Sequence, residues 1–152
     1  MDRLALIHRI LREHNVTSVA TVDFFEKPHK YAEDDSLYMR EAHFVVAVGS
    51  MESPTMSEVA NRLNVTQGAV TQMATRLENK GYVIRQKDTQ DKRVTTISLT
   101  EKGKILCEEH IAFDKKEHAN VSEMLKEFSD EELEKLIRYE KIMWELFTKR
   151  MP

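Results

Sequence analysis

The sequence of 152 residues contains few of the residue types on which secreted proteins and nucleotide-using enzymes depend. Its single cysteine, Cys107, cannot form an internal disulfide or a Cys-x-x-Cys metal or redox motif. Its four glycines stand far apart in the chain, which excludes a glycine-rich loop around a nucleotide phosphate. With only three prolines as well, the chain has few helix breakers, and long helices are expected.

Long hydrophobic runs are also missing. No stretch of about 18 apolar residues occurs, so the sequence predicts no transmembrane helix. The first nine residues, MDRLALIHR, are amphipathic and show no signal-peptide pattern. With 41% hydrophobic and 32% charged residues, the composition is typical of a single globular domain. We therefore expect a cytoplasmic protein that has no membrane partner.

The net charge of −3 is small, but it is unevenly distributed. Residues 55–104 contain nine Lys and Arg against five Asp and Glu, a net charge of +4, which leaves −7 for the rest of the chain. Phosphates attract Lys and Arg regardless of nucleotide sequence. A basic middle segment between acidic flanks indicates a nucleic-acid-binding module on a self-associating scaffold, and ordinary surface variation is the alternative that charge alone leaves open.

The segments before residue 50 predict two helices. Leu4, Ile7 and Leu11 have helical spacing, and we expect a helix over residues 2–26. Residues 27–35, with one proline and three acids, predict a loop. A second helix is expected over residues 36–48, ending at Gly49.

The middle of the chain specifies two short helices. Thr55 and Glu58 have the spacing of a capping box, which predicts a helix start at Met56 and an end near Leu63. After a tight turn at residues 64–65, Thr66 is a natural N-cap for a second helix that ends at residues 80–81. On that helix the positions that follow the i, i+3, i+4, i+7 rule predict a core-facing side, formed by Val70, Met73, Ala74 and Leu77.

The pattern then changes to alternation. Residues 82–87 and 94–99 predict two strands of a hairpin, joined by the charged loop 88–93. A long helix is expected over residues 100–126. Ser129 and Glu132 form another capping box at the start of a last helix, which extends through Phe147.

Two short helices at a tight turn, followed by a hairpin, predict a winged helix-turn-helix. The major groove of B-DNA accepts one α-helix, and a hairpin tip can place an arginine in the neighbouring minor groove. Arg93 has that position, and Asp91 could orient its guanidinium through a charge-assisted pair. The candidate DNA-binding residues are Gln67, Thr71, Gln72, Thr75, Arg76, Lys87, Asp91, Lys92 and Arg93.

The central third of the chain resembles the MarR family of transcriptional regulators. The resemblance is carried by the runs MSEVA from Met56, LNVTQGAVT from Leu63, LENKGYV from Leu77, DKR from Asp91 and LTEKG from Leu99. It implies major-groove and backbone contacts for Gln67, Thr71, Gln72 and Arg76, and a minor-groove contact for Arg93. It also implies a homodimer on a pseudo-palindromic DNA operator, which is released when a small ligand, a metal or an oxidant changes the spacing of the two lobes.

The expected fold is mainly α-helical with a small β-hairpin. A winged lobe over residues 51–99 carries the DNA contacts, and helices over residues 1–50 and 100–152 form the dimerisation region of a single intertwined domain. The late helices have more apolar surface than one chain would cover, notably at Phe113, Ile142, Trp144, Leu146 and Phe147. Two-fold symmetry also matches DNA half-sites about 10 base pairs apart.

The effector is an unknown small molecule, and no cofactor is specified. Zinc is an alternative, because Cys107, His110, Asp114 and His118 share one face of the long helix, and His43 could approach it. Zinc-responsive members of the family resemble the chain at His43 and His110, with Asp114 standing where they have a second helix-borne histidine. A satisfied core histidine at His110 is the competing interpretation. Lipid-synthesis repressors of the same family, which use no metal, resemble the chain near residues 41–43.

Three other interpretations are weaker. The late position of Cys107 favours a small buried side chain over a peroxide sensor. A winged-helix module that binds only proteins would show little salt dependence, whereas binding to DNA weakens steeply with salt. No Ser/His/Asp or Cys/His arrangement at a recognisable turn indicates an enzyme. We therefore expect a non-enzymatic DNA-binding regulator, most simply a repressor.

Overall fold

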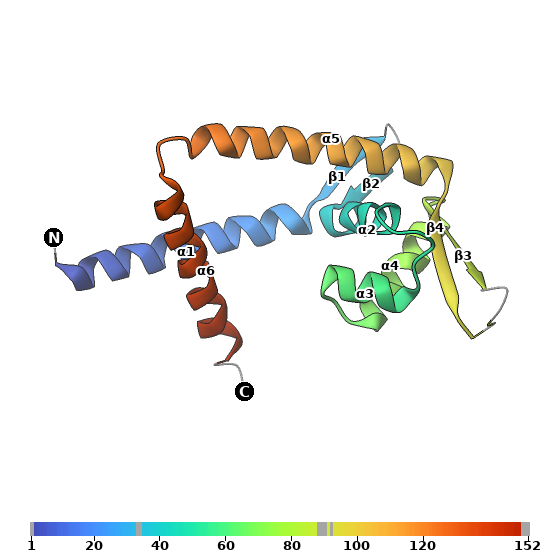
Figure 1. Ribbon diagram of the computed structural model, residues 1–152, viewed down its shortest axis with the longest axis horizontal. Coiled ribbons are helices and arrows are strands. Elements are labelled where there is room, and N and C mark those ends of the chain that lie inside the picture. The colour runs from blue at the N-terminus through green and yellow to red at the C-terminus, as the bar shows by residue number, and fades with distance from the viewer. Residues whose placement is uncertain (1, 33–34, 88–90, 92, 150–152) are drawn as a thin grey trace. The chain divides into compact units, whose positions relative to one another are not determined.

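The computed structural model describes residues 2–32, 35–87, 91 and 93–149, and Figure 1 shows its helices and strands. The chain divides into two compact units, residues 1–111 and residues 112–152. Among the described residues, no helix is both long enough and apolar enough to cross a membrane. The mainly helical architecture with a small antiparallel hairpin agrees with the expected fold class.

The first unit begins with helix α1 (Arg3–Glu26), whose N-terminus is capped by the Asp2 carboxylate. The predicted loop over residues 27–35 is wrong, because strands β1 (Pro28–Ala32) and β2 (Asp35–Tyr38) pair there as an antiparallel hairpin. Helix α2 (Met39–Gly49) consequently begins three residues later than predicted. The first three residues of the predicted helix, 36–38, belong to β2 and pair with β1.

Helices α3 (Met56–Leu63) and α4 (Gln67–Asn79) form the predicted helix-turn-helix. The Thr55 hydroxyl accepts from the Glu58 backbone N–H, and the Glu58 carboxylate accepts from the Thr55 backbone N–H at 2.7 Å. Asn64 ends α3 in the left-handed conformation with a φ of 52°, which permits the tight turn. Thr66 caps α4 as predicted.

The wing consists of strands β3 (Val83–Lys87) and β4 (Thr95–Leu99), which pair in antiparallel register from Val83 with Leu99 to Lys87 with Thr95. Gly81, with a φ of +76°, provides the change of direction between α4 and β3. The sheet is joined to the start of α3, because the Ile97 N–H donates to the Pro54 carbonyl at 2.9 Å.

One hydrophobic core holds these elements together. Its side chains come from β2, α2, α3, α4, both strands of the wing and the first half of α5 (Glu101–Met124). The predicted core positions of α4 belong to it, since Val70, Ala74 and Leu77 are fully buried and Met73 packs against them. The core therefore fixes the outer side of α4 as the side that faces away from the protein.

The second unit contains the remainder of α5 and helix α6 (Asp130–Thr148). Ser129 and Glu132 form the predicted capping box at the start of α6. Among the described residues of α6, only Met143 is buried, and α1 in the first unit buries none. Apolar side chains are therefore exposed along both helices. Of the predicted dimerisation surface, Phe113 is exposed on α5, and Ile142, Trp144 and Phe147 are exposed on α6.

Candidate DNA interface and effector site

The outer side of α4 carries a continuous row of polar side chains. Its five members are all exposed: Gln67, Thr71, Gln72, Thr75 and Arg76. The Thr71 and Thr75 hydroxyls donate to backbone carbonyls one turn earlier, at 2.9 Å each, which orients their methyl groups and leaves hydroxyl lone pairs on the surface. The predicted polar face of the helix is thus exposed and accessible to the base edges of a DNA groove.

Part of this row lies beside the wing. A hollow of about 340 Å³ is lined by the start of α3, by Gln67 and Thr71 of α4, and by Arg93 and its neighbours. The Gln67 amide donates to the Ser57 hydroxyl at 3.2 Å. The structure therefore brings Gln67, Thr71 and Arg93 together, and adds Ser57, which the sequence patterns did not indicate.

The wing places its charged residues near the ends of the two strands. Arg93 is exposed, and its backbone N–H donates to the Asp91 carboxylate at 2.9 Å. The Lys87 ammonium donates to the Thr95 hydroxyl across the hairpin at 2.9 Å. Lys92 lies outside the described residues. The Asp91 carboxylate thus accepts from the Arg93 backbone, whereas the sequence pattern had predicted a pair with the Arg93 guanidinium.

Arg76 has a partner that the sequence analysis missed. Its guanidinium donates to the Glu41 carboxylate of α2 at 3.1 Å, and Glu41 is only 1% exposed. The signal was the one acidic residue of α2, at the third position of the helix, where a carboxylate can accept from the N-cap backbone.

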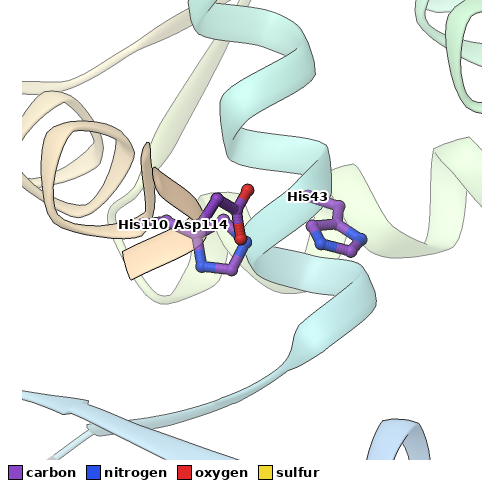
Figure 2. A group of neighbouring side chains, drawn as sticks. All are labelled: His43, His110 and Asp114. Carbon is purple, nitrogen blue, oxygen red and sulfur yellow. The ribbon is translucent and has the colours of Figure 1, made fainter. Parts of the chain in front are cut away.

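A cluster of possible metal ligands includes His43 of α2 and His110 of α5 (Figure 2). Their ring centroids are 5.1 Å apart. Asp114 follows His110 by one turn on the continuous helix α5, and the three side chains each offer a ligand atom within 4.8 Å of the others. Two imidazoles and a carboxylate are a donor set that zinc accepts, so these residues fit the metal.

Tyr31 is a further member of this region that sequence reasoning did not find. Its hydroxyl lies 3.2 Å from His110 Nδ1, and His110 is fully buried. In the tautomer whose Nδ1–H donates to the Tyr31 oxygen, Nε2 is the nitrogen that can bind a metal. Tyr31 escaped notice because it belongs to β1, inside the segment that was predicted to be a loop.

The other two metal candidates do not join the cluster. His118 is exposed on α5, two turns beyond His110. Cys107 is buried, and this burial, followed by the negative charge of Glu108, raises the pKa of its thiol. A thiol with a raised pKa is a poor nucleophile and a poor metal ligand at neutral pH, as expected for a small buried side chain.

A cavity of about 390 Å³ lies between α2 and the helix-turn-helix. Its walls combine apolar side chains of α3 and α4 with three nitrogen-bearing groups, Arg40, His43 and Arg76. Gln72 of the exposed row also lines it. A molecule in this cavity would contact His43, one of the possible metal ligands, and α4 at the same time.

Comparison with known sequences gives the following relationships. The family model described as MarR family matches residues 37–95. The HTH-type transcriptional repressor MdtR of Bacillus subtilis is 47% identical over 57 residues, which are 38% of this chain and 37% of MdtR. An uncharacterized HTH-type transcriptional regulator of Bacillus cereus is 37% identical over 99 residues, which are 62% of this chain and 56% of that protein. The chain thus spans about half the length of this curated relative.

Solved structures match over almost the whole chain. The zinc-responsive MarR family member ZitR of Lactococcus lactis has a TM-score of 0.74 at 24% identity, covering 93% of this chain and 99% of ZitR, which establishes the shared fold. Streptococcus pneumoniae FabT, solved in complex with DNA, has a TM-score of 0.62 at 26% identity, covering 99% and 100%. The sequence over residues 37–95 thus matches the MarR family, and the chain has the fold of MarR family structures.

Proposed function

We propose that the chain is a transcriptional regulator that binds a pseudo-palindromic DNA operator as a homodimer. The observation that carries this proposal is the exposed polar row of α4 beside Arg93 of the wing. MarR family regulators are non-enzymatic DNA-binding proteins, and FabT was solved on DNA. Repression is the simplest mode, because the relative MdtR is named a repressor.

In this proposal α4 enters the major groove, which is about 12 Å wide and accepts one helix. Amide and hydroxyl groups of the row reach base edges and phosphates, and the wing reaches the adjacent minor groove. Arg76 is set apart from these contacts by its partner Glu41. The proposed contacts are Gln67, Thr71, Gln72 and Thr75 of α4, with Lys87, Asp91, Lys92 and Arg93 of the wing.

The homodimer is supported by the exposed apolar side chains of α1, the second half of α5 and α6. Leu4, Val16 and Val19 of α1 are each more than half exposed, as are Ile142 and Trp144 of α6. Exposed apolar surface of this extent marks an interaction site. A second copy, related by two-fold symmetry, would cover the same helices and place two lobes on two half-sites.

Selection of genomic DNA fragments followed by anisotropy titration tests the DNA-binding function. Arg93→Ala should weaken binding to the selected duplex by about 1–3 kcal/mol, as the loss of a groove contact does. Gln72→Ala should change the selected base preference. Lys141→Ala, which removes a cation from α6, is the matched control and should bind as the wild type does. Equal affinity of the Arg93→Ala variant would contradict the wing assignment.

We further propose that a small molecule regulates DNA binding from the cavity between α2 and the helix-turn-helix. The cavity supports this role because its lining includes Gln72 and Arg76 of α4. An occupant would therefore contact the helix that we place in the major groove.

Zinc is a second candidate effector, favoured by the grouping of His43, His110 and Asp114. The related structure of ZitR is described as zinc-responsive. Zinc supplies a tetrahedral centre that accepts imidazole and carboxylate ligands. Since His43 belongs to α2 and His110 to α5, coordination by both would join these two helices.

Calorimetric titration of the metal-free protein with zinc tests this second candidate. The combined variant His43→Ala/His110→Ala should lose binding, whereas His118→Ala, a histidine of the same helix outside the cluster, should retain it. Equal zinc affinity of the wild type and the combined variant would remove zinc from consideration and leave the small-molecule effector.

A further inference from the structure

We propose that Glu41 withholds Arg76 from the DNA. In this inference, which rests on the proposed DNA-binding function, Arg76 fixes α4 against α2 and neutralises no phosphate. Glu41 is then a positioning residue for the DNA-reading helix, although it belongs to α2 and faces away from the groove. The position and charge of Arg76 alone had indicated the opposite role.

The geometry of Glu41 supports this role. One carboxylate oxygen accepts from the Tyr38 backbone N–H at 3.0 Å and so caps the start of α2. The other accepts from Arg76 Nη1 at 3.1 Å. A single carboxylate, 1% exposed, thus caps the start of α2 and pairs with a side chain of α4.

The difference in burial decides which partner Arg76 keeps. The Arg76 side chain is 49% exposed, so a phosphate could approach it from solvent. Moving the guanidinium to that phosphate would leave the Glu41 carboxylate buried and without its cation, and water cannot replace the lost partner at a buried site. DNA therefore has to compete with a desolvated carboxylate, and an exposed phosphate contact does not repay that cost.

A second cation, at the C-cap of α4, makes a parallel attachment. Lys80, one turn beyond Arg76, donates from its ammonium to the Ser36 carbonyl of β2 at 2.7 Å. Residues 76 and 80 lie on the same side of the helix, and both reach the junction of β2 and α2. The C-terminal half of α4 is therefore tied to this junction through two side chains.

Other basic residues of the positively charged segment also bind within the protein. Arg85 pairs with Glu78, Lys104 pairs with Glu101, and Lys102 donates to the Lys80 carbonyl. Glu78 and Glu101 are already counted in the net charge of +4 over residues 55–104, so these two pairs leave it unchanged. Glu41, the partner of Arg76, lies outside the segment and is not counted in it.

The salt dependence of DNA binding measures the role of Arg76. The logarithm of the affinity falls with the logarithm of salt concentration by about 0.9 for each neutralised phosphate, or about 1.8 for a dimer with two copies of the residue. The probe is a labelled duplex selected from random-sequence DNA. We expect Arg76→Gln and the charge-free pair Glu41→Gln/Arg76→Gln to keep the wild-type slope, because Arg76 contributes nothing to it.

Glu41→Gln alone should steepen the slope by about 1.8, because it releases Arg76 toward the phosphates. Arg93→Gln is the positive control and should reduce the slope by the same amount. The paired variant leaves no unpaired buried charge, so it remains informative if either single variant fails to fold.

The outcomes separate this inference from the proposed function. A paired variant with a slope shallower by about 1.8, beside a normal response of Arg93→Gln, would overturn the role of Glu41 and leave DNA binding intact. A wild-type protein whose affinity for the selected duplex does not depend on salt would overturn DNA binding itself, and the inference with it.

Discussion

The helix-turn-helix with its wing and the two outer helices α1 and α6 use their apolar residues in opposite ways. In the former, Val59, Val70, Leu77 and Ile97 are at most 1% exposed, and they share one core with α2. In contrast, α1 has no buried residue. On α6, Trp144 is 66% exposed. One region therefore completes its core within a single chain, and the other does not.

This difference separates two kinds of structural information. Within the helix-turn-helix and its wing, helix caps, turns and core positions lie close together in the sequence and act together. For α1 and α6, the amphipathic pattern specifies a helix, and in the proposed homodimer the surface that covers it belongs to a second copy. Mutations in the two regions should consequently affect different equilibria, folding in the first and association in the second.

The largest effect is expected from Trp144→Glu. If a second copy covers α6, the substitution places a carboxylate in a desolvated interface and removes a large aromatic contact, which together should weaken the dimer by about 4 kcal/mol, or roughly a thousandfold. Sedimentation equilibrium measures this change. The circular dichroism of the monomeric variant should still show a folded helix-turn-helix.

Lys135→Ala is the matched control on the same helix. Lys135 is exposed and pairs with Glu131 one turn earlier, an arrangement that contributes little. Its loss should leave the association constant unchanged. A Trp144→Glu variant that dimerises as tightly as the wild type would remove the contrast between the two regions.

The next effect is expected from Gly103→Ala, at the point where α5 packs on the wing. A Cβ atom at this position would lie 2.0 Å from the Tyr82 carbonyl oxygen, and Gly103 is buried. Because the obstacle is backbone, α5 has to move, and the free energy of unfolding should fall by about 3 kcal/mol. Urea unfolding at several protein concentrations should show a loss that does not depend on association.

Gly68→Ala is the control for this substitution. Nothing but the Thr66 hydroxyl, at 4.0 Å, lies near its Cβ position. The change should raise stability by up to about 1 kcal/mol through helix propensity. It should nevertheless weaken DNA binding if the bare backbone at the start of α4 approaches the DNA closely. A destabilised Gly68→Ala variant would contradict this account of both glycines.

Much of the fold followed from local patterns in the sequence. The capping boxes at Thr55 and Ser129, the N-cap at Thr66 and the turn at Gly81 are confirmed, because each depends on residues at most four positions apart. The wing was likewise predictable, since its two strands alternate in polarity and are joined by a short polar connection.

What escaped prediction depends on contacts between distant segments. The β1–β2 hairpin has a proline at its first residue and acids near its turn, and the pairing that makes it a sheet has no local signature. The bond from Glu41 to Arg76 joins residues 35 positions apart. That from Tyr31 to His110 joins residues 79 positions apart. Hence the helix face was predicted, while its attachment to α2 was not.

A smaller effect is expected from Thr66→Ala, which removes the N-cap of α4. The Thr66 hydroxyl accepts from the Ala69 N–H at 3.2 Å, and its loss should lower the free energy of unfolding by about 1 kcal/mol. Thr66→Ser retains the acceptor and should restore most of it. The loss, measured by urea unfolding, should be the same at every protein concentration. A loss that grows on dilution would mean that the stability of the helix-turn-helix also depends on association.

The smallest effect is expected at the capping carboxylates Glu58 and Glu132, which have the same chemistry in the two regions. Hydrogen bonds from the N-cap backbone, and secondly from its hydroxyl, lower the pKa of each below its ordinary value of 4.5. Their stabilisation is therefore complete above pH 4.5 and disappears as the pH falls through the lowered pKa.

Glu58→Gln and Glu132→Gln should each be less stable than the wild type at pH 7 and should approach it in acid, as followed by urea unfolding. In the helix-turn-helix the deficit of Glu58→Gln should not depend on protein concentration. That of Glu132→Gln should, because in the proposed homodimer α6 gains its packing from a second copy. Equal concentration dependence of the two deficits would mean that both regions depend on association for their stability.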